Sequence, residues 1–257
     1  MKIEVLGCSG GMGLGEFTTC IRINDQFLID AGSGLGCLSQ EEMLKVKRLF
    51  ITHAHLDHIC FLPLLLDNLF EQLSKPLEVH ALPKVIQALK THVFNWSIWP
   101  DFTCLPDSEN AVLNLNTLTL NSAFTTPDNL TITPIVAKHV VPACGYSVKD
   151  EKGNVFCFSG DTHFDNSVVE NYNRLGHIDL LMLECAFPNR LQSVADKSQH
   201  LTPKSLAKLI NALKMPPEAL LITHLKPAFR DEIKYQLDDL GLPVKIHLLK
   251  SGDAFLL

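Results

Sequence analysis

The sequence lacks the features that mark exported, membrane-spanning and nucleic-acid-binding proteins. Its first residues, MKIEVLGCSGG, run directly into a strand-like stretch and contain neither the apolar core nor the cleavage site of a signal peptide. The longest apolar segment, CFLPLLLDNLF, is too short to cross a bilayer. The net charge of −6 provides no broad cationic field for the phosphates of a nucleic acid. We therefore expect a cytoplasmic protein with no membrane partner, for which nucleic acid is a disfavoured ligand.

Paired cysteines and nucleotide-binding glycine motifs are also absent. The eight cysteines occur singly, without CxxC pairs, which predicts reduced and mostly buried thiols rather than a disulfide scaffold. The glycine-rich segment 7–15, GCSGGMGLG, has neither the GxGxxG spacing of a dinucleotide-binding loop nor the GK[ST] ending of a P-loop. We interpret it as a tight turn after the first strand, with close approach to a bound ligand as the alternative.

Short apolar and β-branched runs recur along the 257 residues and predict an α/β fold rich in strands. Some runs, such as DLLML at the start of 179–187, are apolar throughout and indicate strands covered on both faces. The predicted strands are 2–7, 20–32, 47–54, 77–82, 111–120, 130–141, 155–161, 179–187, 219–225 and 244–257. Helical periodicity is found in 83–94, 203–213 and 229–240, and a shorter helix is expected near residue 41. The early strands follow one another through turns, so we expect mixed sheets, and without a visible linker we expect one domain.

A cluster of metal-ligand residue types follows the strand RLFIT. His53, His55, Asp57 and His58 lie within the six residues HAHLDH. Alternate residues His53 and His55 can face one metal ion, and Asp57 and His58 can turn toward a second. Neutral imidazole and carboxylate are ligands that zinc, iron and manganese accept. A solvated polar loop is the alternative, which the spacing and the position after an apolar strand disfavour.

Further ligand types stand at the ends of other predicted strands. His139 follows PIVAK, Asp161 closes VFCFSGD, and His224 follows ALLIT. Each alone would more often be structural, but together they supply the ligands that one loop cannot provide for two ions. Asp30, which closes FLID, fits a second-shell carboxylate that receives a hydrogen bond from a ligating imidazole. A turn-initiating aspartate is its alternative role.

This order of residues resembles the metallo-β-lactamase superfamily over nearly the whole chain. The resemblance implies a four-layer αββα sandwich, with two mixed sheets, helices on the outer faces and a two-metal site at one edge. It assigns His53, His55 and His139 to one ion and Asp57, His58 and His224 to the other, with Asp161 bridging them. Asp57 also belongs to the implied catalytic set. The implied cofactors are two divalent ions, zinc in preference, with manganese and iron left open by the ligand set.

Within the superfamily, five segments resemble class II cyclic nucleotide phosphodiesterases: THAHLDHI, FNWSIWPDF, ECAFPN, HLTPKSL and ITHLKP. A more distant likeness is to the RNA-processing nuclease tRNase Z, although no tRNA-gripping arm is visible. Cys60 and Phe61 stand where the phosphodiesterase pattern favours a small residue. The implied activity is hydrolysis of a cyclic nucleotide or a similar small phosphodiester by a hydroxide held between two ions. Thioester or lactone hydrolysis, RNA cleavage and non-catalytic binding of metal or a second messenger are the alternatives.

The segment QHLTP, 199–203, provides a candidate proton donor. A ribose alkoxide leaves poorly unless it is protonated, and a general acid contributes roughly 10²–10⁴-fold. We predict that His200 is this acid and that Glu184 orients it. A loop histidine beside the helix start at Thr202-Pro203 and a further metal ligand are the alternatives for His200. Lys226 is predicted to contact substrate phosphate, with an ordinary exposed lysine as its alternative.

An aromatic-rich insertion is expected around residues 92–110, which contain VFNWSIWPDF. Its aromatic side chains could stack on a purine, but packing in a small core or at a subunit interface is more usual. A homodimer is therefore left open. The remaining histidines are assigned structural roles: His80, His92, His163, His177 and His247.

Overall fold

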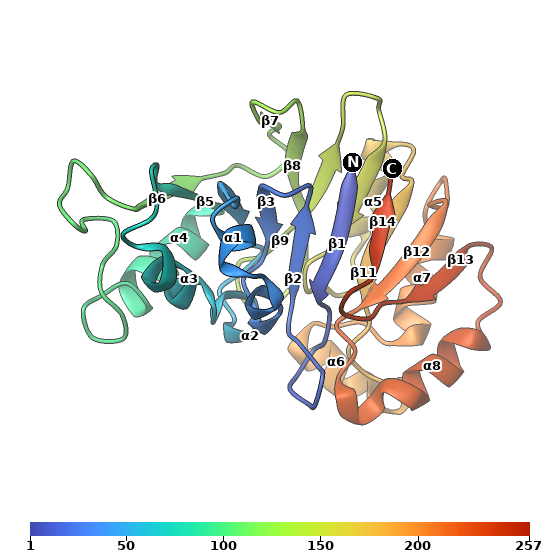
Figure 1. Cartoon of the computed structure of the whole chain (residues 1–257). Helices are drawn as coiled ribbons and strands as arrows, with labels where there is room; N and C mark the ends of the chain where they lie inside the picture. The colour runs from blue at the N-terminus through green and yellow to red at the C-terminus, as the bar shows by residue number, and fades with distance from the viewer.

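Two seven-stranded sheets dominate the computed structural model, which describes residues 1–257 (Figure 1). The first sheet has the order β14 (Ala254–Leu256), β1 (Lys2–Gly7), β2 (Cys20–Ile23), β3 (Phe27–Ile29), β4 (Arg48–Phe50), β5 (Leu77–Ala81) and β6 (Leu113–Thr117). The second has the order β13 (Lys245–Leu248), β12 (Ala219–Thr223), β11 (Leu180–Glu184), β10 (Val155–Phe158), β9 (Cys144–Lys149), β8 (Thr131–Val136) and β7 (Phe124–Thr125). Strands β3 to β6 and β10 to β13 are parallel, and the remaining pairs are antiparallel, so both sheets are mixed as predicted.

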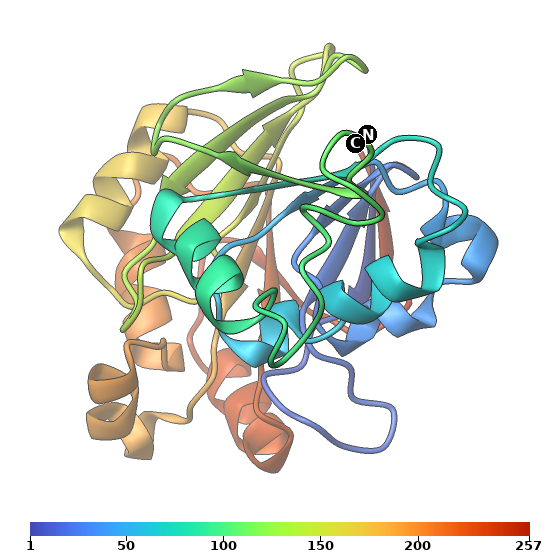
Figure 2. The ribbon, with the colours of Figure 1, turned by 90° about the vertical axis from the view of Figure 1, so that its left-hand side faces the viewer.

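Most of the helices lie on the outer sides of the two sheets, and α6 lies at one end of the sandwich (Figure 2). The helices α1 (Gln40–Met43), α2 (Leu56–Ile59), α3 (Leu62–Leu69) and α4 (Pro83–His92) accompany the first sheet. The helices α5 (Asn166–Leu175), α6 (Gln192–Ser198), α7 (Pro203–Asn211) and α8 (Arg230–Asp238) accompany the second. Short 3₁₀ turns η1 (Ser33–Cys37), η2 (Asn189–Leu191) and η3 (Pro227–Phe229) complete the connections. The layer order is the αββα arrangement expected from the resemblance.

Two of the predicted strands are wrong as single elements. Segment 20–32 forms β2 and β3, which pair as a hairpin across a turn that begins at Asn24, a residue with a positive φ of 50°. Segment 244–257 forms β13 and β14, which belong to different sheets and are separated by a turn at Gly252. Strands β7 and β9 and helices α2, α3, α5 and α6 were not predicted. Helix α5 does carry a helical period, with Val168, Val169 and Tyr172 buried on one face, so a local signal for it was present in the sequence.

The central strands of the second sheet are buried on both faces, as their apolar sequence predicted. In β11, Leu180 and Met182 contribute to the core that the two sheets share, whereas Leu181 and Leu183 pack in the layer beneath α5, α7 and α8. Successive side chains point to opposite faces of a strand, so alternate residues of β11 pack in the shared core and in the layer beneath the helices.

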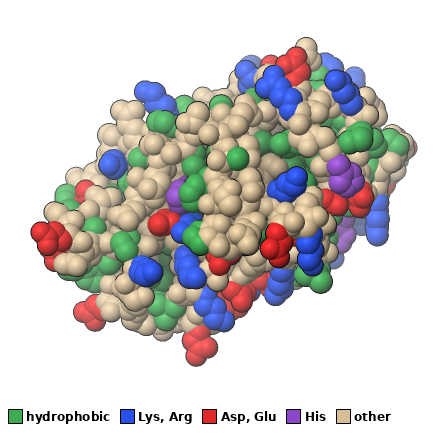
Figure 3. Space-filling view, turned by 90° about the horizontal axis from the view of Figure 1, so that it is seen from above, with side chains coloured by type: hydrophobic (Ala, Val, Ile, Leu, Met, Phe, Trp, Pro, Cys, Tyr) green, Lys and Arg blue, Asp and Glu red, His purple; other side chains and the backbone are tan.

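The surface at the end of the sandwich where the termini lie carries lysines, arginines and acidic side chains of both signs, interspersed (Figure 3). None of the helices combines the length and the apolar character needed to cross a bilayer. All eight cysteines are free thiols, and five of them are buried, in agreement with the prediction of reduced and mostly buried cysteines.

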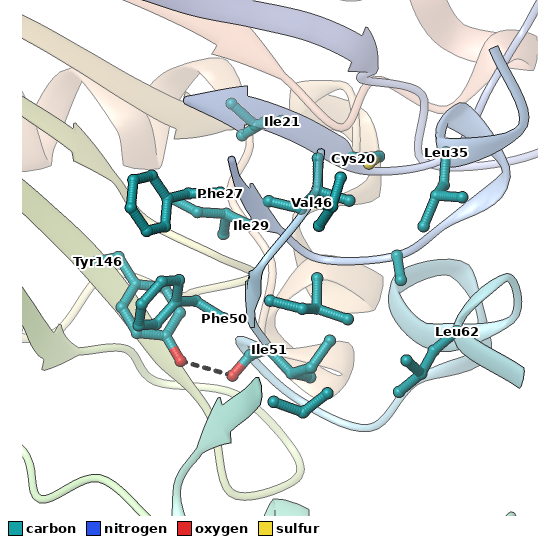
Figure 4. Packing of buried hydrophobic residues seen from close by; sticks show 14 of the residues in the cluster. Cys20, Ile21, Phe27, Ile29, Leu35, Val46, Phe50, Ile51, Leu62 and Tyr146 are labelled. Carbon is teal, nitrogen blue, oxygen red and sulfur yellow. Dashed lines mark hydrogen bonds between the residues drawn. The ribbon is translucent and has the colours of Figure 1, made fainter. Parts of the chain in front are cut away.

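A buried tyrosine joins the two sheets. Tyr146 lies in β9, and its hydroxyl donates a 2.8 Å hydrogen bond to the carbonyl oxygen of Ile51, which follows β4 (Figure 4). Its ring also packs edge-on against Phe50, with ring centres 5.7 Å apart. Tyr172 in α5 is equally buried, but its hydroxyl has no hydrogen-bond partner. The two tyrosines therefore differ in what their hydroxyls contribute.

This difference predicts opposite effects of removing each hydroxyl. Tyr146→Phe should lower the free energy of unfolding by about 1–3 kcal/mol, because the buried Ile51 carbonyl loses its donor. Tyr172→Phe should be neutral or slightly stabilising, because it removes a buried hydroxyl that has no partner. Urea unfolding of the two variants measures both effects, and an equal loss in each would contradict the assignment.

Candidate metal centre and catalytic site

The candidate site lies at the edge of the sandwich where strands β3, β4, β8, β10 and β12 end. Asp30 follows β3, and His53 follows β4 in the first sheet; His139, Asp161 and His224 follow β8, β10 and β12 in the second. Strands β3 and β4 are parallel, and β8 has the same direction as β10 because both are antiparallel to β9. Because these strands run in the same direction within each sheet, residues that are distant in the sequence lie close together at this edge.

The structure brings together all seven residues that the sequence proposed as metal ligands. Their potential ligand atoms form two groups, His53–His55–His139–Asp161 and Asp57–His58–Asp161–His224, and within each group the atoms lie within 4.8 Å of one another. Asp161 belongs to both groups. Its Oδ2 is 3.6 Å from His53 Nε2 and 3.4 Å from His224 Nε2, and its Oδ1 is 3.5 Å from His58 Nε2.

Hydrogen bonds behind the cluster determine how two of the imidazoles face it. His58 Nδ1 donates to Asp30 Oδ2 at 2.7 Å. Thr52 Oγ1 donates to the same carboxylate oxygen at 2.8 Å and therefore accepts the hydrogen of His53 Nδ1, which is 3.0 Å away. Each ring thus carries its hydrogen on Nδ1 and presents Nε2 to the cluster. Such outer hydrogen bonds fix the tautomer and orientation of metal ligands.

The third imidazole of the first group is fixed by the backbone. His139 Nδ1 lies 3.2 Å from the carbonyl oxygen of Gln199, which can only accept a hydrogen bond. His139 therefore has its hydrogen on Nδ1 and presents Nε2 to the cluster, 3.2 Å from Nδ1 of His55. Protein groups thus orient three of the candidate ligands, His53, His58 and His139.

Several atoms of the cluster have no protein partner although they are buried. His53 Nε2, His58 Nε2 and Asp161 Oδ1 make no hydrogen bond. Buried polar groups normally have partners, and imidazole nitrogen with carboxylate oxygen is the ligand chemistry of zinc, manganese and iron. The residues present therefore fit two divalent ions that share Asp161. Their role as ligands stays a prediction.

Burial and neighbouring charges act in opposite directions on the pKa values of the residues in the cluster. Burial raises the pKa of Asp161, but the imidazoles of His224, His58 and His53 outweigh burial and hold that pKa well below its usual value. Burial lowers the pKa of His58, but the Asp161 and Asp30 carboxylates outweigh it and raise that pKa well above its usual value. Burial holds the pKa of His53 well below its usual value. A cation bound at His58 therefore has to displace a proton from that ring.

The glycine-rich segment lies against the loop that carries His224. The His224 amide donates to the carbonyl of Cys8 at 2.7 Å, and the Gly10 amide donates to the carbonyl of Leu225 at 3.0 Å. A Cβ atom on Gly10 would lie 2.4 Å from the carbonyl oxygen of His224, so only glycine fits. The segment does turn, at Gly13 to Glu16, but Gly10 serves close packing against a candidate ligand.

His200 and Glu184 form a buried pair beside both groups. His200 Nδ1 donates to Glu184 Oε1 at 2.7 Å. The ring centre of His200 is 4.9 Å from that of His139 and 5.4 Å from that of His224. Burial lowers the pKa of His200, but Glu184 outweighs burial and raises that pKa above its usual value. The hydrogen bond to Glu184 therefore favours the protonated form of the His200 imidazole.

Backbone amides hold Glu184 as well. Its Oε1 accepts from the amide of Thr162 at 3.1 Å, and its Oε2 accepts from the amides of Ala186 and Leu201 at 3.1 and 3.3 Å. Asp161, Glu184 and His200 also lie within the spacing of a metal site. Both oxygens of Glu184 already accept hydrogen bonds, which disfavours a metal ion at this third group, and the role of Glu184 in orienting His200 stays a prediction. Thr202 caps α7, as predicted, by accepting from the amide of Ser205.

Lys226 and the aromatic insertion contact the protein itself. Lys226 Nζ donates to the carbonyl oxygen of Gly10 at 3.2 Å and lies 5.3 Å from the ring centre of Phe187. Its contact with substrate stays a prediction. Phe94 and Phe102 are buried, in agreement with the prediction that the aromatic residues pack in a small core, whereas 64% of Trp96 is exposed.

Three residues of the site were missed by the sequence interpretation. Thr52 links Asp30 to His53, and Gln199 offers its carbonyl to His139. His163, assigned a structural role, donates from Nδ1 to the carbonyl of His200 at 3.0 Å. The available signal was that each lies within two residues of His53, Asp161 or His200. The contacts of Gln199 and His163 run through backbone carbonyls, which leave no pattern of side-chain types in the sequence.

The chain is similar to several known proteins in sequence. A model described as the beta-lactamase superfamily domain matches residues 25–225. A 3′,5′-cyclic-nucleotide phosphodiesterase of Aliivibrio fischeri is 29% identical over 230 residues, which cover 81% of this chain and 66% of that relative. The chain spans 57% of a second phosphodiesterase relative, from Saccharomyces cerevisiae. A ribonuclease Z of Prochlorococcus marinus is 25% identical, over 93% of each chain.

Solved structures share the architecture. Unliganded yeast PDE1 matches with a TM-score of 0.80 at 20% identity, over 100% of this chain and 99% of that one. YhfI of Bacillus subtilis, a metallo-beta-lactamase fold protein, matches with a TM-score of 0.78 at 18% identity, over 99% of each chain. These matches confirm the predicted four-layer fold.

The contact between Asp30 and His58 predicts a test of metal binding. Asp30→Asn should weaken zinc binding by about 10–100-fold, because His58 loses its charged acceptor. Asparagine tolerates the positive φ of 61° at this position, so the backbone should keep its course. Competition with a chromophoric chelator measures the affinity. Asp253→Asn is the matched control, because Asp253 pairs with His247 at 3.0 Å on the exposed surface; an equal loss in both variants would contradict the role of Asp30.

The packing of Gly10 predicts a selective loss of metal. Gly10→Ala should displace His224 and reduce the metal content of the purified protein, because the new Cβ meets backbone atoms that cannot move aside. In Gly11→Ala, the Cβ lies 3.3 Å from Pro227 and should leave metal content unchanged. Elemental analysis measures the metal content of both variants, and full metal content in Gly10→Ala would refute the prediction.

Proposed function

The chain belongs to the beta-lactamase superfamily as a metal-dependent hydrolase, and we propose that it hydrolyses a cyclic nucleotide or a similar small phosphodiester. One observation supports this proposal: the buried His200–Glu184 hydrogen bond lies beside two groups of His and Asp side chains that could hold metal ions. The relatives named 3′,5′-cyclic-nucleotide phosphodiesterase support the same substrate class. Because the chain spans less than two thirds of either relative, their full activity is not carried over.

The two groups that share Asp161 would hold two divalent ions, for which zinc is the preferred identity. When bound, such ions supply a nucleophile at neutral pH and neutralise charge on the phosphoryl oxygens. The chain itself would orient the imidazoles that hold these ions. Asp30 and Thr52 orient the imidazoles of His58 and His53, and the carbonyl of Gln199 orients that of His139.

The proposed reaction needs an acid because its leaving group is an alkoxide. Opening a cyclic 3′,5′-phosphodiester breaks a bond between phosphorus and a ribose oxygen, and the departing alkoxide requires a proton. Glu184 accepts the hydrogen on Nδ1 of His200, so the second hydrogen of the imidazolium is on Nε2, in a ring whose centre lies 4.9 Å from that of His139 and 5.4 Å from that of His224. His200 therefore donates from Nε2 to the leaving oxygen. Lys226, beside the same loop, is proposed to contact a phosphate oxygen.

Thioester hydrolysis makes less use of this pair. A thioester leaves as a thiolate, which needs little assistance because thiol pKa values lie near 8.5. An RNA nuclease is the second candidate, supported by the ribonuclease Z match over 93% of each chain. The net charge of −6 disfavours it, since RNA binding depends on cationic contacts to phosphate.

A panel of substrates tests the proposal. The metal-loaded protein is assayed with 3′,5′-cyclic AMP, 2′,3′-cyclic AMP, bis(4-nitrophenyl) phosphate, a thioester and a precursor tRNA. Turnover of a cyclic nucleotide is the expected result. Turnover of the thioester alone would overturn the proposal, and cleavage of precursor tRNA without cyclic nucleotide turnover would replace it with the second candidate.

Removing the acid should affect substrates according to their leaving groups. His200→Ala should slow the hydrolysis of a cyclic nucleotide by roughly 10²–10⁴-fold. Hydrolysis of bis(4-nitrophenyl) phosphate should change far less, because nitrophenolate leaves without a proton. His177→Ala is the control, since His177 lies in the 176–179 loop before β11, at the end of this strand opposite Glu184. Equal losses on both substrates would refute the proton-donor role.

A further inference from the structure

The turn that carries His200 is held by two imidazoles through its backbone. Gln199 ends α6 in the left-handed conformation, with a φ of 53°. Its carbonyl accepts from His139 Nδ1 at 3.2 Å, and the next carbonyl, that of His200, accepts from His163 Nδ1 at 3.0 Å. Two consecutive carbonyls thus point toward the loops that carry His139 and Asp161.

His163 is anchored independently of this turn. Its amide donates to the carbonyl of Lys138 at 2.7 Å, and the Lys138 amide donates to Thr162 Oγ1 at 3.0 Å. The Thr162 amide in turn donates to Glu184 Oε1. Residues 138–139 and 161–163 are therefore tied together, and the side chain of His163 extends from this unit to the backbone of His200.

We propose that His163 is a positioning residue for proton transfer: it fixes the backbone of His200 relative to Asp161 and the metal groups. This inference rests on the proposed function of His200. The bond from His200 Nδ1 to Glu184 sets the direction of the ring, but the distance from the ring to the reacting oxygen depends on where the backbone lies. Misplacement of a catalytic group by about 1 Å can cost as much as 10²-fold in rate.

Two substitutions separate the hydrogen bond from the bulk of the side chain. His163→Leu removes the donor and keeps an apolar group of similar size. His163→Asn retains an N–H close to the position of Nδ1. We expect His163→Leu to slow the hydrolysis of a cyclic nucleotide by about 10-fold, a part of the roughly 10²–10⁴-fold that an acid contributes. Bis(4-nitrophenyl) phosphate should be hydrolysed within about 2-fold of the wild-type rate, and His163→Asn should restore most of the loss.

A double-mutant cycle with His200→Ala shows whether His163 acts through His200. If it does, adding His163→Leu to His200→Ala should cause no further loss, because the imidazole whose position His163 sets is already absent. Multiplying losses would overturn the proposal, as would equal losses of His163→Leu on both substrates. Metal content is measured for every variant, and a loss of metal in His163→Leu would assign His163 to the metal groups instead.

A readout that does not depend on activity separates this inference from the proposed function. The amides of His200 and Leu201 donate to the Ala195 carbonyl and to Glu184 Oε2, so their hydrogen exchange reports opening of the turn. In the metal-loaded protein, exchange at 199–202 should be faster in His163→Leu and near wild-type in His163→Asn. Unchanged exchange in His163→Leu would overturn the inference. If the wild type hydrolyses no phosphodiester but exchange changes as expected, the proposed function fails while the contact of His163 with the turn stands.

Discussion

The alignment of strand ends at one edge of the sandwich is the constraint on which the site depends. Strands β3 and β4 in one sheet and β8, β10 and β12 in the other all end there. Side chains from residues 30 to 224 meet at this edge, although few of them are neighbours in the sequence. The two-sided burial of β10, β11 and β12 keeps the edge rigid, because each strand is packed from both faces. Rigid strands hold ligand atoms with the precision that a loop alone does not provide.

Two carboxylates perform the same task at different places in this edge. Asp30 accepts from His58 and from Thr52, and Glu184 accepts from His200 and from three backbone amides. Neither carboxylate needs to touch a substrate to matter. Each fixes which nitrogen of an imidazole carries the hydrogen, and so each decides what that imidazole can offer: a lone pair in one case, a proton in the other.

Much of this site could be predicted from the sequence, because polar ligand types at the ends of apolar strands leave a visible pattern. His53, His55, Asp57 and His58 follow a strand within six residues, and His139, Asp161 and His224 repeat the pattern singly. The layer order followed from the resemblance. The split of 20–32 into β2 and β3 could not be predicted, since Asn24 adopts its left-handed turn inside an otherwise strand-like segment. The contacts of Gln199 and His163 were also hidden, because they run through carbonyl groups that every residue has.

The four hydrogen bonds to Glu184 have a consequence for competition between metal and proton. Asp161, Glu184 and His200 are close enough together to attract a surplus cation. Such a cation would have to displace His200 Nδ1 and three buried amides from the carboxylate, and those amides have no other acceptor at hand. These hydrogen bonds thus disfavour a cation at Glu184. On the proposed function, His200 would therefore remain available as an acid while the two neighbouring groups hold ions.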